Sequence, residues 1–175
     1  MADVSRPSRP EEELAEAGRE YFRLGWLAGS GANFSVLLAR KPARLWITSP
    51  GRGVNPTDDA NFFEIDDDAE ILQGFGRPSD ETLLHLAIYR HRPRARCVLY
   101  SRSVAGTIVA DAAFVDGSVS FKGYEVLKGL SGVTSHEHTE MIPIVENSGD
   151  LIALAHVIEN VLMENTSIHA VFLRR

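Results

Sequence analysis

Residues 78–101, with the sequence PSDETLLHLAIYRHRPRARCVLYS, decide the fold. Ser79 is the predicted N-cap of a helix that runs through Arg90, because a serine hydroxyl can accept from an N–H group that the first turn leaves free. The apolar residues of this helix recur at the helical period, at Leu83, Leu84, Ala87 and Ile88. Pro93 ends the helix, and the short apolar run 96–101 predicts a buried strand directly after it. A helix that leads straight into a buried strand indicates an α/β fold.

The chain before this stretch predicts one helix and four short strands. Residues 10–24 place apolar side chains near the helical period and acidic side chains in the first turn, and Gly25 ends the helix. The predicted strands of this half cover residues 34–39, 44–48, 62–65 and 70–72. Lys41 and Pro42 between the first two strands indicate a hairpin.

The chain after this stretch alternates helices with strands. Its predicted elements are a helix over 104–112, a strand over 118–121, a short helix over 124–130, a strand over 141–145, a helix from 151 and a strand over 168–173. Ser148 and Asp150 are the predicted caps of the helix from 151, which has the clearest apolar stripe in the chain. We therefore expect a disordered leader, residues 1–9, and one domain over residues 10–175. The domain should be a three-layer α/β/α sandwich around a central mixed or antiparallel sheet.

The composition argues against several classes of function. The chain has 175 residues, 44% of them hydrophobic and 24% charged, with a formal net charge of −6. A negative net charge argues against a general nucleic-acid surface, because such a surface needs clustered cations. No apolar run approaches the roughly 20 residues that cross a bilayer, and the opening MADVSRPSRP does not resemble a signal peptide. We expect a cytoplasmic protein without nucleic-acid or membrane partners, and a lone Cys97 that is buried and structural.

Motifs spread along the chain carry a resemblance to a known family. They are LGW at 24–26, GSGANFS at 29–35, WIT at 46–48, PSDET at 78–82, VL at 98–99, SVA at 103–105, GYE at 123–125, SHEH at 135–138 and PI at 143–144. In this order and spacing they resemble the class II aldolase/adducin family and its branch of methylthioribulose-1-phosphate dehydratases. The resemblance covers nearly the whole chain after residue 12.

The resemblance implies a Zn²⁺-dependent lyase on an α/β/α sandwich, of which this chain would be a C-terminally short example. It also implies a tetramer with active sites between subunits. The dehydratases of the family remove water from a methylthio-sugar phosphate in methionine salvage. The metal ion polarises the sugar carbonyl and stabilises an enediolate, while a carboxylate moves the proton.

The zinc-binding positions that the resemblance implies are replaced in this chain. The family has two histidines spaced i, i+2 at a strand end, so that both face one metal ion, where this chain has Tyr100 and Arg102. A guanidinium has no lone pair for a metal ion, and a phenol is a poor zinc ligand. The third family histidine would follow Arg175, where the sequence ends. We therefore predict no metal ligands and no zinc cofactor.

Part of the family's phosphate-binding segment persists. The predicted ligand-binding residues are Asn33, Gly51, Arg52, Ser79 and Arg102. Ala32 and Pro50 replace the glycine and serine that the family usually has, and Asp80 places a negative charge beside the expected anion, so phosphate affinity should fall. Arg52 or Arg102 could compensate, because a guanidinium can grip an anion in the space that a metal ion leaves.

Three residues are candidates for catalytic proton transfer. Glu81 matches the acid/base position of the family's aldolases, Glu125 matches that of its dehydratases, and Tyr100 is the third candidate. Glu81 has an alternative role as a charge partner of its helix N-terminus. His136 and His138 are expected in a surface loop or a supporting role. The remaining histidines are expected to be structural: His85, His91, His156 and His169.

These observations leave three functions open. They also leave open whether the protein is an enzyme. In the first, it binds or processes a small sugar-phosphate-like or anionic ligand without metal, with proton transfer by Glu125 and Tyr100. In the second, it is a non-catalytic, adducin-like interaction or assembly subunit, either as a homo-oligomer or with an intact homologous subunit. In the third, it is an active zinc-dependent dehydratase with another ligand set, such as Glu125, His136 and His138.

Overall fold

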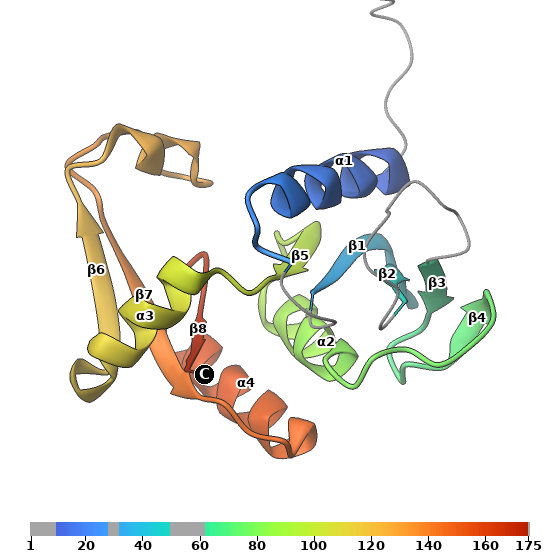
Figure 1. The fold of residues 1–175 in the computed structure, drawn as a ribbon. Helices are drawn as coiled ribbons and strands as arrows, with labels where there is room; N and C mark the ends of the chain where they lie inside the picture. The colour runs from blue at the N-terminus through green and yellow to red at the C-terminus, as the bar shows by residue number, and fades with distance from the viewer. Residues whose placement is uncertain (1–9, 28–31, 50–61, 175) are drawn as a thin grey trace, which may run out of the picture. The chain divides into compact units, whose positions relative to one another are not determined.

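The chain folds into two compact units, Met1–Ser103 and Val104–Arg175 (Figure 1). The computed structural model describes residues 10–27, 32–49 and 62–174. The predicted leader, residues 1–9, lies outside the described residues. Each unit has its own sheet, and a single domain over residues 10–175 stays a prediction.

The first unit is built on a five-stranded sheet with the strand order β4-β3-β2-β1-β5. Its strands are β1 (Asn33–Arg40), β2 (Ala43–Thr48), β3 (Phe62–Ile65), β4 (Ile71–Gln73) and β5 (Cys97–Tyr100). Every neighbouring pair in this sheet is antiparallel. The predicted hairpin is confirmed, because β1 and β2 pair directly across the turn at Lys41 and Pro42.

Two helices cover opposite faces of this sheet, α1 (Pro10–Arg23) and α2 (Thr82–His91). The side chains of a strand alternate between its two faces, so a strand can contribute core residues under both helices. Phe34 and Phe62 form one apolar cluster with Leu14 of α1. The second cluster joins the opposite face to α2 and consists of Leu37, Leu45, Ile47, Phe63, Ile65, Leu86, Tyr89 and Val98. The first unit is therefore an α/β/α sandwich with an antiparallel central sheet.

The start of α2 differs from the prediction. The helix begins at Thr82, and the residue at its N-cap, Glu81, makes no side-chain cap hydrogen bond. Ser79 is not the cap, because its hydroxyl donates to the Glu81 carboxylate at 2.6 Å. The buried face of α2 also differs from the predicted stripe, because Leu84 and Ala87 are buried but Leu83 and Ile88 are only partly buried. The buried residues of the helix are Thr82, Leu84, His85, Leu86, Ala87 and Tyr89.

The prediction of a buried Cys97 is wrong. Cys97 is exposed because it begins β5, and β5 lies at the edge of the sheet. Its neighbour Val98 points to the opposite face and is buried, as the alternation along a strand requires. A short apolar run does not reveal from sequence whether its strand lies at the centre or the edge of a sheet.

The second unit has a three-stranded sheet with the order β6-β7-β8. Its elements are α3 (Val104–Ala112), η2 (Phe114–Asp116), β6 (Ser118–Lys122), η3 (Glu125–Gly129), β7 (Thr139–Glu146), α4 (Leu151–Glu164) and β8 (Phe172–Arg174). β7 pairs antiparallel with β6 and parallel with β8, so this sheet is mixed. None of the helices in the described parts of the chain has the length and apolar character needed to cross a membrane.

The helix α4 folds as its sequence predicts. The Asp150 carboxylate accepts a hydrogen bond from the N–H of Ala153 at 3.0 Å, which is an N-cap interaction. The Ser148 hydroxyl accepts from the N–H of Asp150 at 3.0 Å and so supports the cap from outside the helix. The sequence predicts an apolar stripe at Leu151, Leu154, Ala155, Ile158, Val161 and Leu162. Four of these residues are buried in α4: Leu154, Ala155, Ile158 and Leu162.

Candidate functional site

Three of the predicted site residues form one hydrogen-bonded chain in the first unit. The Asn33 amide Nδ2 donates to the Ser79 hydroxyl at 2.8 Å. The Ser79 hydroxyl in turn donates to Glu81 Oε2 at 2.6 Å. Asn33 begins β1, whereas Ser79 and Glu81 immediately precede α2, so the fold joins segments 46 residues apart. We call these three side chains the Asn33–Ser79–Glu81 chain.

The direction of each hydrogen bond in this chain follows from which side-chain atoms carry a proton. A serine hydroxyl has one proton, and a carboxylate can only accept, so the Ser79 proton goes to Glu81. Asn33 must then donate to Ser79 from its amide nitrogen, which leaves its carbonyl oxygen Oδ1 as an acceptor. Asn33 is 2% exposed, and this Oδ1 is buried without a hydrogen-bond partner. Buried polar atoms in native proteins are usually paired, so the chain ends in an unused acceptor.

Tyr100 lies next to this chain in the sheet, and Arg102 follows two residues after the end of β5. Tyr100 ends β5 and pairs with Asn33 across the strands. The backbone N–H of Arg102 donates to the carbonyl of Trp26 at 2.9 Å. The Arg102 guanidinium carbon lies 5.9 Å from the centroid of the Tyr100 ring, which is within the range of a cation–π contact.

The donor atoms at this strand end do not suit a divalent metal ion. A guanidinium offers only N–H donors and a permanent positive charge, and a phenol oxygen is a weak ligand in its neutral form. Within the described residues, no three histidine, cysteine, aspartate or glutamate side chains come together as a group that could hold a metal ion. The chemistry available here is hydrogen bonding and recognition of negative charge.

Glu125 lies in the second unit, at the start of η3. Its Oε2 accepts from the Lys128 ammonium at 2.6 Å, and its Oε1 lies 3.3 Å from Nδ1 of His136. The Glu125 side chain is 71% exposed. Glu125 is therefore an accessible carboxylate that contacts the Lys128 ammonium and the His136 imidazole. Two other predicted ligand-binding residues, Gly51 and Arg52, lie outside the described residues.

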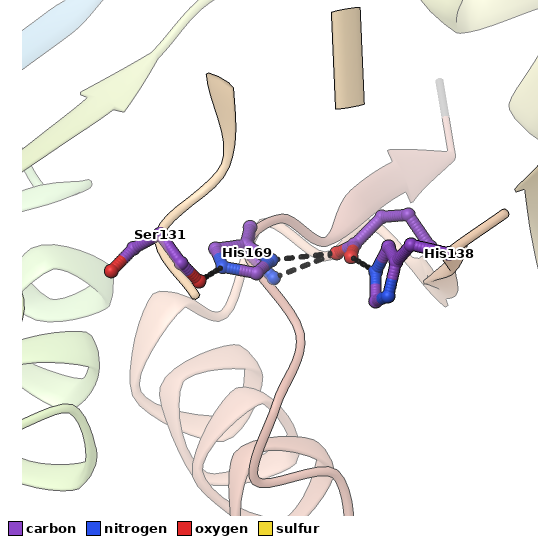
Figure 2. A network of polar contacts seen from close by, with 4 residues as sticks. Ser131, His138 and His169 are labelled. Atoms are coloured by element: carbon purple, nitrogen blue, oxygen red, sulfur yellow. Dashed lines mark hydrogen bonds and ion pairs between the residues drawn. The ribbon is translucent and has the colours of Figure 1, made fainter. Parts of the chain in front are cut away.

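A second polar network surrounds Glu140 near the start of β7 (Figure 2). His138 Nε2 lies 2.9 Å from Glu140 Oε2, and Glu140 Oε1 receives both His169 Nδ1 at 3.0 Å and the His169 backbone N–H at 3.1 Å. The other ring nitrogen of His169 lies 2.9 Å from the carbonyl oxygen of Ser131. Both ring nitrogens of His169 face acceptors, so the ring donates from both only as an imidazolium.

These contacts shift the ionisation of Glu140, which is 4% exposed. Burial alone raises the pKa of this carboxyl, but hydrogen bonds from His138 and His169, together with the charge of His169, outweigh burial and lower it. Sequence reasoning singled out both histidines and missed the glutamate between them. The available signal was an acidic residue two positions after His138, just before the apolar run of the predicted strand.

His85 has a different environment. Its Nδ1 lies 2.7 Å from the Ser35 hydroxyl, which lies 3.0 Å from the Tyr89 hydroxyl. Burial lowers the pKa of His85 to about 3, so the ring is neutral at physiological pH. A neutral, buried ring between β1 and α2 fits the predicted structural role.

Comparison with known proteins identifies relatives over almost the full chain. A family profile described as the Class II Aldolase and Adducin N-terminal domain matches residues 12–175. A methylthioribulose-1-phosphate dehydratase of Methylococcus capsulatus is 36% identical over 158 residues, which are 90% of this chain and 75% of that protein. A methylthioribulose-1-phosphate dehydratase of Pseudoalteromonas translucida is 33% identical over 162 residues, 93% of this chain and 75% of its own length.

Solved structures share the fold. A crystal structure of YgbL from Escherichia coli superimposes with a TM-score of 0.70 at 26% identity, over 94% of this chain and 73% of that one. An L-fuculose 1-phosphate aldolase also gives a TM-score of 0.70, at 19% identity, over 97% of this chain and 73% of that one. The second similarity is informative about the fold alone.

Proposed function

The chain belongs to the class II aldolase and adducin family, and from this premise we propose that it binds a small sugar-phosphate-like or anionic ligand without a metal ion. The observation that carries the proposal is a contrast within the first unit. The Asn33–Ser79–Glu81 chain is intact, whereas the adjacent strand end presents Tyr100 and Arg102.

Zinc-dependent lyase chemistry does not fit the donor atoms at this strand end. A catalytic zinc ion needs three protein ligands with available lone pairs and one open position. Arg102 contributes a fixed positive charge that would repel the ion, and Tyr100 would have to lose its proton to bind it. No step of the proposed function therefore passes through a metal ion.

Arg102 supports recognition of an anionic group. A guanidinium can donate two parallel hydrogen bonds to a phosphate or carboxylate, and it keeps its charge throughout the physiological pH range. Asn33 and Ser79 would contact the same ligand, and Gly51 and Arg52 are further predicted contacts. The relatives named as dehydratases act, by their names, on a sugar phosphate, which makes that class of ligand the first to test.

Proton transfer to or from the bound ligand would be the remaining chemistry. Glu81 is held by Ser79 in the first unit, and Glu125 is an exposed carboxylate in the second. Tyr100 could donate a proton to a developing oxyanion. Without a metal ion to stabilise an enediolate, these groups would support only a slow reaction or binding alone.

A non-catalytic interaction or assembly subunit is the second candidate. The replaced strand end favours it, because a fold that has lost its metal chemistry can persist for its surfaces alone. The partner would be a second copy of this chain or a homologous subunit with an intact metal site. Light scattering after size-exclusion chromatography tests this candidate, and a strictly monomeric chain that binds no homologue would remove it.

An active zinc dehydratase would require another ligand set, for which Glu125, His136 and His138 are the candidates. His136 lies against Glu125, whereas His138 lies against Glu140. A metal ion shared by all three would require at least one of these contacts to break. This reading is therefore the least favoured of the three.

Calorimetric titration of the full chain with methylthioribulose 1-phosphate, in the presence of EDTA, tests the proposal. We expect saturable binding that is retained in EDTA. The Arg102→Ala variant should bind at least about ten-fold more weakly, because even one charge-assisted hydrogen bond is worth about 1.5–3 kcal/mol. Arg23→Ala is the matched control, since Arg23 pairs with Glu20 at 72% side-chain exposure. Absence of binding, or binding that Arg102→Ala leaves unchanged, would contradict the proposal.

A further inference from the structure

The side chain of His169 lies between two hydrogen-bond acceptors in the second unit (Figure 2). Its Nδ1 lies 3.0 Å from Glu140 Oε1, and its Nε2 lies 2.9 Å from the carbonyl oxygen of Ser131. Glu140 is ionised at neutral pH because its pKa is lowered, and a carbonyl oxygen has no proton, so both oxygens can only accept. The His169 ring must therefore supply both hydrogens.

Only the charged form of the His169 ring fits this position. An imidazolium has a proton on each nitrogen, whereas a neutral ring has one proton and one lone pair. In either neutral tautomer, the lone pair would face an oxygen at 3.0 Å or less, which is a repulsive contact. The carboxylate is the stronger acceptor, and the backbone N–H of His169 also donates to Glu140, at 3.1 Å. Loss of the ring proton should therefore break the contact with Ser131 first.

Glu140 is the charged group that faces the His169 ring. Among the described residues, the side chain of His169 makes no hydrogen bond or ion pair besides those with Glu140 and Ser131. His138 lies on the other oxygen of Glu140, and a neutral His138 keeps this contact because its Nε2 alone has to donate. The His169 side chain is 25% exposed, so its ring can exchange a proton with water.

The contact with Ser131 matters because the segment 131–137 has little else to hold it. Most of its residues are exposed. Away from its own turns, it is joined by the N–H of Gly123, which donates to the carbonyl of His136 at 3.0 Å, and by Nδ1 of His136, which lies 3.3 Å from Glu125. A segment with few buried contacts opens at a low cost in free energy, so one hydrogen bond can decide whether it is closed.

We infer that His169 is a protonation-dependent latch on the segment 131–137. With its proton, the ring joins Ser131 to Glu140 and the segment is closed; without it, the segment opens at Ser131. Imidazoles change charge between about pH 5 and pH 8, so the latch should be closed at the lower end of this range and open at the upper end. Because the segment carries His136, opening would also loosen the contact of His136 with Glu125. The latch belongs to the second unit and does not depend on anion binding in the first.

NMR spectroscopy of the full chain measures both parts of the latch. The Gly132 amide shares a peptide bond with the Ser131 carbonyl, so its nitrogen chemical shift reports the hydrogen bond from His169. We expect this shift and the His169 ring signals to titrate with one midpoint between about pH 5 and pH 8. Amide hydrogen exchange of residues 131–137, corrected for its intrinsic pH dependence, should show about ten-fold less protection at about pH 8.5 than at about pH 5.5, the equivalent of one charge-assisted hydrogen bond.

Three variants separate the latch from the other groups that titrate nearby. His169→Gln keeps a polar side chain that cannot become charged, so the Gly132 shift should lose its pH dependence and the segment should be open at both pH values. His136→Gln and His138→Gln remove the neighbouring imidazoles and are the matched controls. Both controls should keep the pH dependence of the Gly132 shift.

Two results in the wild type would overturn the inference. One is a His169 ring that keeps the same charge from about pH 5 to about pH 9, and the other is protection of residues 131–137 that does not change over this range. A pH dependence at Gly132 that survives in His169→Gln would overturn it as well. If His169→Gln does not fold, the wild-type titration decides, because a shared midpoint of the Gly132 and His169 signals supports the latch and separate midpoints contradict it.

Discussion

Each unit of this protein contains a polar network around a deeply buried side chain, and the two networks end differently. In the first unit, Asn33 is 2% exposed and passes a hydrogen bond through Ser79 to Glu81, but its own oxygen has no partner. In the second unit, Glu140 is 4% exposed, and both of its oxygens are hydrogen-bonded (Figure 2).

This difference separates a carboxylate whose two oxygens are both hydrogen-bonded from an amide whose oxygen has no partner. A buried polar group is stabilising only when its hydrogen bonds are made, because an unmade bond leaves the cost of removing the group from water. Glu140 meets this condition through three donors from two histidines. Asn33 does not meet it, and an atom left without a partner becomes favourable when a ligand supplies the missing donor.

The largest effect on stability is expected at Glu140. Glu140→Ala removes the acceptor for His138 and His169 and should lower the free energy of unfolding by about 3 kcal/mol. Urea denaturation of the variant and the wild type measures the loss. Glu137→Ala, an exposed neighbour, is the matched control and should change stability by less than about 0.5 kcal/mol. A loss at Glu140 no larger than the control would remove the distinction between the two networks.

The same carboxylate should make stability depend on pH. The folded-state pKa of Glu140 is lowered from its ordinary value of 4.5, so the ionised form contributes stability that is present above pH 4.5. This contribution is lost as the pH falls through the lower folded-state pKa. The difference in unfolding free energy between the wild type and Glu140→Gln should therefore shrink on acidification from about pH 7 to about pH 3. A difference that stays constant would show that Glu140 is not stabilised as an anion.

A smaller loss is expected at Asn33. Asn33→Ala removes a single neutral hydrogen bond to Ser79 and should cost about 1 kcal/mol in urea denaturation, since the Oδ1 atom contributes no bond that could be lost. Asn160→Ala, an exposed position on α4, is the control for replacing an asparagine. A loss at Asn33 as large as that at Glu140 would mean that both networks are structural.

A loss of similar size is expected at Ser79. Ser79→Ala removes both hydrogen bonds of the Asn33–Ser79–Glu81 chain, but Ser79 is partly exposed and water can replace its hydroxyl, so the free energy of unfolding should fall by about 1 kcal/mol. The same variant should also bind methylthioribulose 1-phosphate more weakly, because Ser79 is a proposed ligand contact. Thermal unfolding and ligand titration on one preparation compare the two effects. Loss of stability without any change in affinity for this ligand would show that Ser79 is structural alone.

The sequence predicted most elements of the fold because each has a strong local signal. The α4 stripe, its Asp150 cap and the hairpin at Lys41 and Pro42 depend on residues close together in the chain. The start of α2 was less predictable, because the Ser79 hydroxyl bonds to Glu81 and Asn33 instead of capping. The exposure of Cys97 depends on strand order, which no local pattern encodes.

The structure brings together three of the proposed site residues. The resemblance points to Asn33, Ser79 and Glu81, and the structure joins them by hydrogen bonds that sequence cannot specify. The sequence does not predict the network around Glu140, because this carboxylate is hydrogen-bonded to His169, which lies 29 residues further along the chain. A contact of that kind is fixed by the path of β7 and the segment after α4, not by any motif.

The central claim is that this member of the family works without the family's metal ion, and metal analysis tests it directly. The full chain, purified without chelators and equilibrated with zinc, is analysed by mass spectrometry for bound metal and assayed for dehydration of methylthioribulose 1-phosphate. We predict no stoichiometric zinc and no dehydration, with sugar-phosphate binding that EDTA does not reduce. Stoichiometric zinc that Tyr100→Ala and Arg102→Ala release, together with elimination of water from the sugar phosphate, would contradict the account.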